Sequence, residues 1–470
     1  MEWRVKKFIA ACIGIIASFS LVLVLSACSA ENLPDFSDLP TFAQEILSDI
    51  LPNSSPESPP ATEIRIATAW QYLYLFDEPI FQLQQEHNIN ITEIAVPHDS
   101  IMETLNSSVM SGEPFAEVVL LSGNMMLSAI TNNLVLALEE FIPLDFSIWQ
   151  NRQNWQNRQN SRQGRQNIST IQPAAEFVGL HWAFAPYTVN IYGTFLGVNL
   201  DIISSIAAPN PAILYQADNW TFDQFSGILY QAQQTDYFGI SGEPAEIITN
   251  LIAANDGVFI QNFYYAYDDY RTIAALKFAQ HVLQFWQPTH GITAAQANTF
   301  AFLTGESVFF PLTEVILQQK QSQQNGANFR YTIVPFPRGP DNTSGVSFMH
   351  GFSTGLAVPR GTQNALAVYS ALEKLFATAD QRQLLAQETS YLTALFASSA
   401  DATRTINILQ QQGKFDLGMA IPTFTWLHTI FAETFLQNAD SNIPAMVERF
   451  RRPQQNIIET TLENWIFRTE

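Results

Sequence analysis

The sequence predicts an α/β fold with a mainly parallel sheet in each domain. Short strand-like runs alternate with helix-like stretches from Glu63 onward, and several of these stretches begin with helix-capping residues. Alternation of this kind is typical of strands that are joined by crossover helices. The chain has 470 residues, of which 47% are apolar, so it is long enough for two or three domains and can fill a core in each.

Three apolar runs are the first expected strands. They are Ile64–Thr68, Ile89–Val96 and Val118–Leu121. The third is apolar at every position, as in a strand that is buried on both faces. Between the second and the third, Asp99 or Ser100 can cap a helix that runs to about Met110.

Three further helices are predicted from capping boxes, in which a Thr is followed three residues later by a Gln. The boxes are Thr221–Gln224, Thr293–Gln296 and Thr378–Gln381. The Thr side chain of such a box accepts a hydrogen bond from a backbone N–H group that the first helical turn leaves unpaired. Each box therefore marks the expected start of a helix.

The N-terminus has the pattern of an export signal. Arg4, Lys6 and Lys7 precede the run Phe8–Leu25, which is apolar or small throughout, as in a signal peptide. The sequence LSAC that ends at Cys28 resembles the bacterial lipobox, in which the cysteine is lipidated and becomes the new N-terminus. We therefore expect residues 1–27 to be removed and Cys28 to carry a lipid.

An uncleaved membrane anchor is the alternative, because an apolar run of this length just reaches the ~17–25 residues that span a bilayer. Both interpretations place the rest of the chain outside the cytoplasm, since the basic residues precede the apolar run. Residues 28–61 are rich in Pro, Ser, Asp and Glu, so we expect a flexible spacer there. Only Cys12 and Cys28 occur, so the processed chain can form no internal disulfide.

The chain is strongly acidic, with a formal net charge of -21. Without residues 1–27, which hold three basic residues and one acidic residue, 19 basic and 42 acidic residues remain, a net charge of −23. A nucleic-acid surface needs clustered Lys and Arg, so this charge argues against nucleic acid as a partner. It also disfavours anionic ligands, although a single local Arg could override it.

One segment differs from the rest of the chain in composition. Residues 151–167 read NRQNWQNRQNSRQGRQN, with four Arg and no acid. We interpret it as a low-complexity surface insertion. Its basic side chains could dock a partner or a lipid headgroup, and the alternative is an expanded loop without a function.

Catalytic motifs are weak. Gly351–Gly355 fits the G-x-S-x-G pattern with Ser353 as the nucleophile, but Leu356–Pro359 follows as an extended stretch where a nucleophile elbow requires a helix. His428 is the only histidine after it. The seven histidines show no metal-binding spacing, and no P-loop or GxGxxG string is present. We therefore expect no catalytic site, no metal and no cofactor.

Aromatic side chains are the more telling feature. Trp70 and Tyr72 follow the first strand, and Trp182 belongs to a second aromatic group in the middle of the chain. Aromatic faces on loops after strands can stack on sugar rings, while neighbouring polar side chains bind hydroxyl groups. The alternative is that these rings belong to the core.

Seven segments resemble motifs of one family in the same order along the chain. They are SGEPFAEVV at 111–119, LVLALEEF at 134–141, GLHWAFAPYTVNIYGTFLGVNL at 179–200, NWTFDQF at 219–225, FAFLTGESVFF at 300–310, VPFPRGP at 334–340 and LAVPRGT at 356–362. Together they resemble the extracellular solute-binding proteins of ABC importers, family 1, which includes sugar-binding lipoproteins.

This resemblance implies a two-lobed, type II periplasmic-binding-protein-like clamshell with a ligand cleft between its α/β lobes. The first lobe would comprise residues 62–186 and 346–410, and the second residues 187–345 and 411–470. The implied mechanism is hinge closure around a ligand. It involves no bond chemistry, so the resemblance implies a binding protein and not an enzyme.

The resemblance also implies which residues contact the ligand. The candidates follow the strands and the crossovers of the two lobes: Trp70, Tyr72, Ser122, Asn124, Tyr187, Asn255, Asp256, Met349, His350 and Gly351. Trp182 is a further candidate because of its aromatic ring. The implied ligand is a polar solute, with an oligosaccharide favoured and a polyamine left open. The implied partners are the lipid anchor and the permease subunits of an ABC importer, with the protein itself a monomer on the outer face of the bacterial cell membrane.

Two other functions stay open from the sequence. The same cleft could serve a sensory or scaffold lipoprotein that reports its ligand to a membrane partner. A surface hydrolase would require Ser353 or a carboxylate pair, such as Asp268–Asp269 or Glu139–Glu140, to take part in turnover. Both acidic pairs are more typical of a solvated surface.

Overall fold

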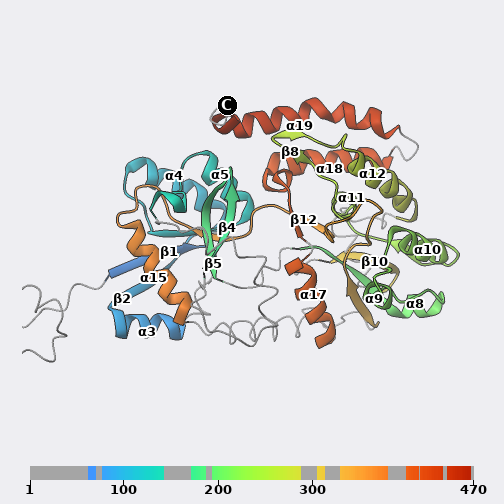
Figure 1. Cartoon of the computed structure of the whole chain (residues 1–470), viewed down its shortest axis with the longest axis horizontal. Helices are drawn as coiled ribbons and strands as arrows, with labels where there is room; N and C mark the ends of the chain where they lie inside the picture. The colour runs from blue at the N-terminus through green and yellow to red at the C-terminus, as the bar shows by residue number, and fades with distance from the viewer. Residues whose placement is uncertain are drawn as a thin grey trace, which may run out of the picture. The chain divides into compact units, whose positions relative to one another are not determined.

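The computed structural model describes residues 62–69, 77–141, 171–186, 193–286, 304–312, 329–378, 398–411, 413–437 and 442–466. The chain divides after Ala61 into two units, and every described residue lies in the second, Thr62–Glu470 (Figure 1). The expected signal peptide, Cys28, the spacer, the 151–167 insertion and the Thr293–Gln296 box lie outside the described residues. Within these ranges, no helix is long and apolar enough to span a bilayer.

The first sheet has six strands in the order β2-β1-β3-β13-β5-β4. Their bounds are β1 Thr62–Thr68, β2 Ile89–Ala95, β3 Val118–Leu121, β4 Ile171–Phe177, β5 Leu180–Pro186 and β13 Gly355–Ala357. The three strands that the N-terminal apolar runs predict are confirmed, and they are neighbours in the sheet. Strand β13 comes from much later in the chain and lies between β3 and β5.

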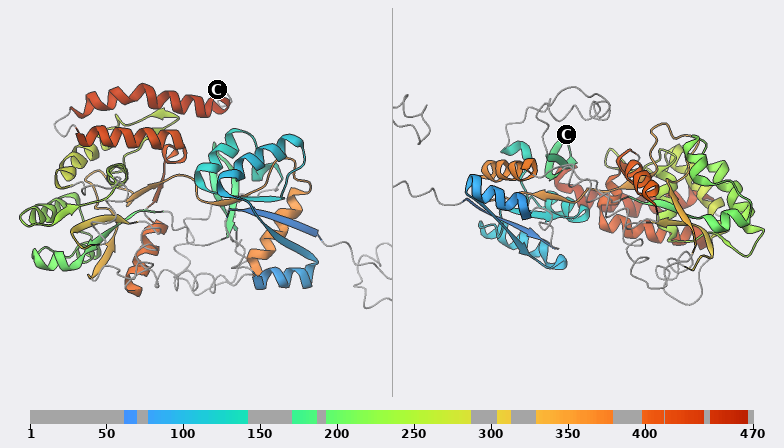
Figure 2. Two further views of the ribbon diagram at one scale, coloured as in Figure 1. Left: turned by 180° about the vertical axis from the view of Figure 1, so that it is seen from behind. Right: turned by 90° about the horizontal axis from the view of Figure 1, so that it is seen from below.

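Helices cover both faces of this sheet (Figures 1 and 2). Alternate residues of β3 are therefore buried on opposite sides of the sheet. One face packs on α3 (Asp77–His87) and α15 (Ala365–Thr378). The other packs on α4 (Ile101–Ser111) and α5 (Gly123–Thr131). The continuous apolar pattern of the third run therefore predicts its environment correctly.

The second sheet has four strands in the order β11-β6-β10-β7. Their bounds are β6 Phe195–Asn199, β7 Phe238–Ile240, β10 Ser307–Leu312 and β11 Tyr331–Val334. Strand β10 is parallel to β7 and antiparallel to β6, which is itself antiparallel to β11. Strand β11 is an edge strand of this sheet.

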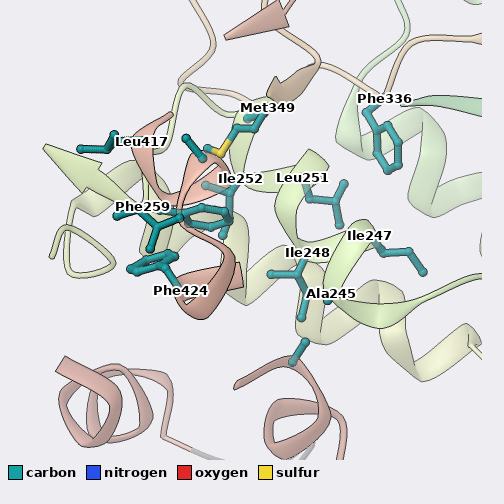
Figure 3. Close-up of a cluster of buried hydrophobic side chains, with 14 of the residues drawn as sticks. Ala245, Ile247, Ile248, Leu251, Ile252, Phe259, Phe336, Met349, Leu417 and Phe424 are labelled. Carbon is teal, nitrogen blue, oxygen red and sulfur yellow. The ribbon is translucent and has the colours of Figure 1, made fainter. Parts of the chain in front are cut away.

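The helices around this sheet come from the middle and the end of the chain. They are α8 Leu200–Ser205, α9 Pro211–Gln216, α10 Phe222–Gln233, α11 Pro244–Ala253, α12 Tyr270–Val282, α17 Ser399–Gln411, α18 Pro422–Gln437 and α19 Ile443–Ile466. Helix α11 is buried over most of its length and packs against α12 and α18. Its apolar side chains, with Phe259 and Phe424, form the cluster in Figure 3.

The prediction of mainly parallel sheets is wrong for both sheets. The first sheet has two parallel and three antiparallel pairings, and the second has one parallel and two antiparallel pairings. In the first sheet the reason is a tight hairpin: Val178 and Gly179 both have positive φ angles, of 55° and 72°, and they turn β4 directly into β5. Strand–helix alternation does not reveal such hairpins.

A two-stranded pair lies apart from both sheets. Strand β12 (Phe348–His350) pairs in parallel with β14 (Gly413–Phe415), and β14 leads into the 3-10 helix η5 (Leu417–Ala420). Helix α17 packs against β11 of the second sheet, and Thr332 donates a hydrogen bond of 2.7 Å to Asp401. Helix α17 also contacts β14. The expected lobe boundary at residue 410 falls within this helix and stays a prediction.

Two of the predicted helix starts are confirmed. Thr221 caps α10 by accepting a hydrogen bond from the backbone N–H of Gln224, at 3.5 Å. The helix expected after Ser100 is present as α4. Thr378, by contrast, is the last described residue of α15, and the remainder of its box lies outside the described residues.

Candidate functional site

The strand register places several strand ends at one edge of the first sheet. Ala67 pairs with Val119, and Leu121 pairs with Gly355. Strand β5 runs in the same direction as β3, because both are antiparallel to β13. The carboxyl ends of β1, β3 and β5 therefore share an edge with the start of β13. Ligands of open α/β sheets bind beyond the carboxyl ends of the strands, so this is the first candidate edge.

Ser122 and Asn124 lie at this edge, where β3 passes into α5. The Ser122 hydroxyl donates to Oδ1 of Asn124 at 2.8 Å, and the backbone N–H of Met125 donates to the same oxygen at 2.9 Å. Asn124 is exposed and Ser122 is partly buried. Both side chains are therefore at least partly accessible, and their role in ligand contact stays a prediction.

Gly123, between them, lies against the segment that leads into β13. A Cβ atom at this position would be 2.0 Å from the carbonyl oxygen of Phe352. Only a glycine allows this approach, so the start of α5 and the segment after β12 are held together by backbone contact. Trp70, Tyr72 and Tyr187 follow β1 and β5 in sequence and lie outside the described residues.

The second sheet has a corresponding edge. Ile240 pairs with Phe309, and Leu312 pairs with Phe195. The ends of β7 and β10 therefore meet the start of β6, which is where the chain arrives from β5. Thr194 and the connection from β7 to α11 lie at this edge.

Two carboxylates lie at the start of α11. The Thr194 hydroxyl donates to Oε1 of Glu246 at 3.0 Å. Burial raises the pKa of Glu246 to about 7, against the lowering effect of the Thr194 hydrogen bond, and the nearby Glu243 raises it further. Desolvation and the charge of Glu433 raise the pKa of Glu243. Among the described residues, neither Glu243 nor Glu246 has an ion pair.

These two glutamates are not among the site residues that the sequence predicts. The available signal is Glu243-Pro244, a carboxylate followed by a helix-initiating proline shortly after the end of β7. Acidic residues in a first helical turn are common on solvated surfaces, so the sequence does not separate the two cases.

Asn255 and Asp256 hold a neighbouring loop. The amide of buried Asn255 donates to the Arg271 carbonyl at 2.8 Å and to Asp341 at 3.1 Å, and its oxygen accepts from the Asp341 backbone N–H at 3.1 Å. Asp256 accepts hydrogen bonds from the backbone and the side chains of Thr343 and Ser344. Their hydrogen-bonding groups are therefore engaged within the protein.

The second crossover is mostly buried. Met349 lies beside Ile252 in the core of the second sheet (Figure 3) and is 5% exposed. Burial lowers the pKa of His350, although a hydrogen bond to the Gly351 carbonyl opposes the shift. A Cβ atom on Gly351 would be 2.9 Å from the carbonyl oxygen of Met419. The crossover is thus packed closely against η5.

Two further candidates, Trp182 and Ser353, lie in surroundings that a structural role explains. Trp182 is 3% exposed, and its indole N–H donates to the Phe177 carbonyl at 3.2 Å, which is the core environment that the sequence leaves as the alternative. Ser353 precedes strand β13, so the G-x-S-x-G string is not followed by a helix and is no nucleophile elbow. No group of three or more metal-ligating side chains occurs in the described part of the chain.

No protein-family model and no curated protein sequence matches the chain. Solved structures do match it. The sugar-binding protein MalE of Xanthomonas citri aligns with 87% of this chain and 100% of its own length, at a TM-score of 0.60 and 14% identity. A cyclo/maltodextrin-binding protein complexed with maltotetraose aligns with 87% and 99%, at a TM-score of 0.58 and 12% identity.

The ABC substrate-binding protein Lmo0181 of Listeria monocytogenes, in complex with cycloalternan, aligns with 86% of this chain and 99% of its own length. Its TM-score is 0.51 and its identity is 10%. At these identities the likeness concerns the fold, and it extends over nearly the whole length of each protein. The chain therefore has the two-lobed α/β fold of the substrate-binding proteins of ABC importers.

Proposed function

We propose that the chain is an extracellular solute-binding lipoprotein that captures an oligosaccharide and delivers it to an ABC permease. The observation that carries this proposal is a polar sheet edge in each lobe. The two edges are close in sequence, since β5 of the first sheet is followed by β6 of the second. The fold that the chain shares with sugar-binding proteins supports the same conclusion.

The chemistry of the two edges suits a sugar. The first offers the hydroxyl of Ser122 and the amide of Asn124, and the second offers Thr194 with the carboxylates of Glu243 and Glu246. Hydroxyl, amide and carboxylate groups bind the hydroxyl groups of a polyol in both hydrogen-bonding directions. Trp70, Tyr72 and Tyr187 would add the aromatic faces on which sugar rings stack.

The mechanism requires no bond chemistry. A ligand that contacts both edges binds the closed arrangement of the lobes more tightly than the open one, and thereby shifts the population toward it. The closed state then docks on the permease. We assign the first lobe to β1–β5 with β13 and α15, and the second to β6, β7, β10 and β11 with α17–α19.

A thermal-shift screen tests the capture of a solute. The protein without residues 1–61 is mixed with maltotetraose, other oligosaccharides, polyamines, amino acids and peptides, because a ligand that binds only the folded state raises the melting temperature. We expect a shift with oligosaccharides that Glu243→Gln weakens and Glu103→Gln, on the outer helix α4, does not. No shift with any oligosaccharide would contradict the proposed function.

We also propose that Cys28 carries the lipid anchor that holds the protein at the outer face of the membrane. Metabolic labelling with a radioactive fatty acid tests this. The wild-type chain should incorporate the label and partition with membranes, whereas Cys28→Ser should do neither. An unlabelled wild-type chain that still remains with membranes would favour the uncleaved anchor.

A further inference from the structure

A cavity of about 450 Å³ lies in the second lobe, at the free edge of β11 between α9 and α17. Its lining includes Leu200 and Arg330, which are near the end of β6 and the start of β11. Thr194 and the two glutamates lie at the opposite end of β6. The cavity is therefore separate from the candidate ligand edge.

An internal network fixes one wall of this cavity. Ser398 caps the start of α17: its hydroxyl oxygen accepts from the Asp401 backbone N–H at 3.1 Å, and the same hydroxyl donates to Oδ2 of Asp401 at 2.8 Å. Oδ1 of Asp401 accepts from Thr332 at 2.7 Å and from Arg404 at 2.5 Å. Both carboxylate oxygens are thus engaged within the protein.

The guanidinium of Arg404 is only partly used by this network. Its Nη1 atom makes all three of its hydrogen bonds, to Asp401, to the Thr332 hydroxyl and to the Ile333 carbonyl. The side chain is 13% exposed. The other N–H groups of Arg404 have no partner among the described residues, and the residue lines the cavity. A buried cation therefore presents unused donors to an open space.

Further hydrogen-bond donors line the cavity beside Arg404. Asn210 uses its side-chain oxygen to accept from the Ala212 backbone N–H at 2.9 Å, which leaves its NH₂ group. Arg330 lies at the rim, where Asp201 holds its Nε atom at 2.7 Å. Apart from the exposed amide of Gln216, which offers both a donor and an acceptor, the side-chain acceptors of the lining are engaged, whereas donors of Arg404 and Asn210 are not. The cavity therefore favours a ligand that is rich in acceptors.

The rest of the lining is apolar. Leu200, Ala212, Ile213 and Tyr331 contribute to it. We propose that this cavity is a second binding site, for a small carboxylate with an apolar body: the carboxylate would accept from Arg404 and Asn210, and the apolar body would lie against Ala212 and Ile213. A planar guanidinium with adjacent free N–H groups matches the two oxygens of a carboxylate.

Fluorine NMR with 4-fluorobenzoate tests the proposal on the full chain, purified in detergent. We expect the fluorine signal to broaden in the presence of the wild-type protein, and the neutral 4-fluorobenzyl alcohol to bind at least about tenfold more weakly, because it lacks the charged acceptor. Ile213→Asp adds a carboxylate at an exposed position of the lining and should abolish the broadening. Ala217→Asp, an exposed residue just after α9 that does not line the cavity, is the matched control.

Arg404→Gln should also weaken binding of 4-fluorobenzoate by about tenfold or more, since the charged donors are lost. Because Arg404 also holds α17, Ile213→Asp with an unchanged melting temperature is the decisive variant. The proposal is overturned if 4-fluorobenzoate does not broaden with the wild type, if the alcohol binds equally well, or if Ile213→Asp binds as the wild type does. An oligosaccharide at the candidate edge should leave the broadening unchanged.

Discussion

The hydroxyl oxygen of Tyr267 lies 2.6 Å from Nδ1 of His428, and both side chains are buried. Burial raises the pKa of Tyr267 far above its ordinary value, so its hydroxyl donates and Nδ1 accepts. On the other side of the ring, Nε2 lies 2.9 Å from the Thr249 hydroxyl and 3.2 Å from the Ala245 carbonyl. Thr249 itself donates to Ala245, so Nε2 carries the proton. This arrangement joins α18 to α11 through a neutral imidazole.

A neutral His428 predicts a loss of stability in acid. Burial lowers its pKa to about 4 from an ordinary value of 6.5. The folded pKa is below the unfolded one, so the stability that the neutral His428 contributes is complete above pH 6.5 and is lost as the pH falls toward 4. The largest loss is about 3 kcal/mol. Denaturant unfolding of the wild type and of His428→Gln at several pH values measures it, and equal pH dependence of the two would refute the assignment.

Glu246 predicts a pH dependence of stability that is opposite to that of His428. Its folded pKa, about 7, is above the unfolded value, so the stability that it contributes is present at low pH and is lost as the pH rises through 7. The free energy of unfolding of the wild type should therefore fall by about 1 kcal/mol or more between pH 5.5 and 8 relative to Glu246→Gln, which cannot ionise. Glu113→Gln, at an exposed site, should follow the wild type. A Glu246→Gln variant with the wild-type slope would contradict the raised pKa.

Two glycines form a matched pair for a packing test. Gly123→Ala brings a Cβ atom against the Phe352 carbonyl and should cost about 1–3 kcal/mol, because backbone must move. Gly227→Ala, in α10 with open space around it, should instead stabilise by about 0.5–1 kcal/mol through reduced unfolded-state freedom. Thermal melting of both variants distinguishes them. Equal effects would mean that the close approach of α5 to the crossover does not exist in solution.

Asn255→Ala separates a structural role from ligand contact. The substitution leaves the Asp341 backbone N–H without its partner and removes the hydrogen bond that the amide donates to the Arg271 carbonyl, so we expect a loss of about 1–3 kcal/mol in the free energy of unfolding. Solute affinity, measured by calorimetry at a temperature where the variant is folded, should change little. A variant of wild-type stability with reduced affinity would restore Asn255 as a ligand contact.

The sequence predicts features that depend on local pattern. The apolar run at β3, the cap at Thr221 and the extended stretch after Ser353 all follow from neighbouring residues, and all are confirmed. Features that depend on distant segments are harder to predict. The side chain of Trp182 is identical whether it faces a ligand or a core, and only the folded structure shows that it is buried and bonded to the Phe177 carbonyl. The glutamates of α11 likewise differ from surface acids only through what surrounds them.

The position of β13 bears on how the chain is made. Gly355–Ala357 lies between β3 and β5, so the first sheet cannot be completed until the second lobe and the return crossover have been synthesised. Contacts between residues so far apart in sequence form slowly, because a long loop must close before they stabilise anything. A chain that emerges from the ribosome therefore stays open for a prolonged period. The export that we propose for this chain would benefit from such a delay, because an unfolded chain is narrow enough to pass through a channel in a membrane.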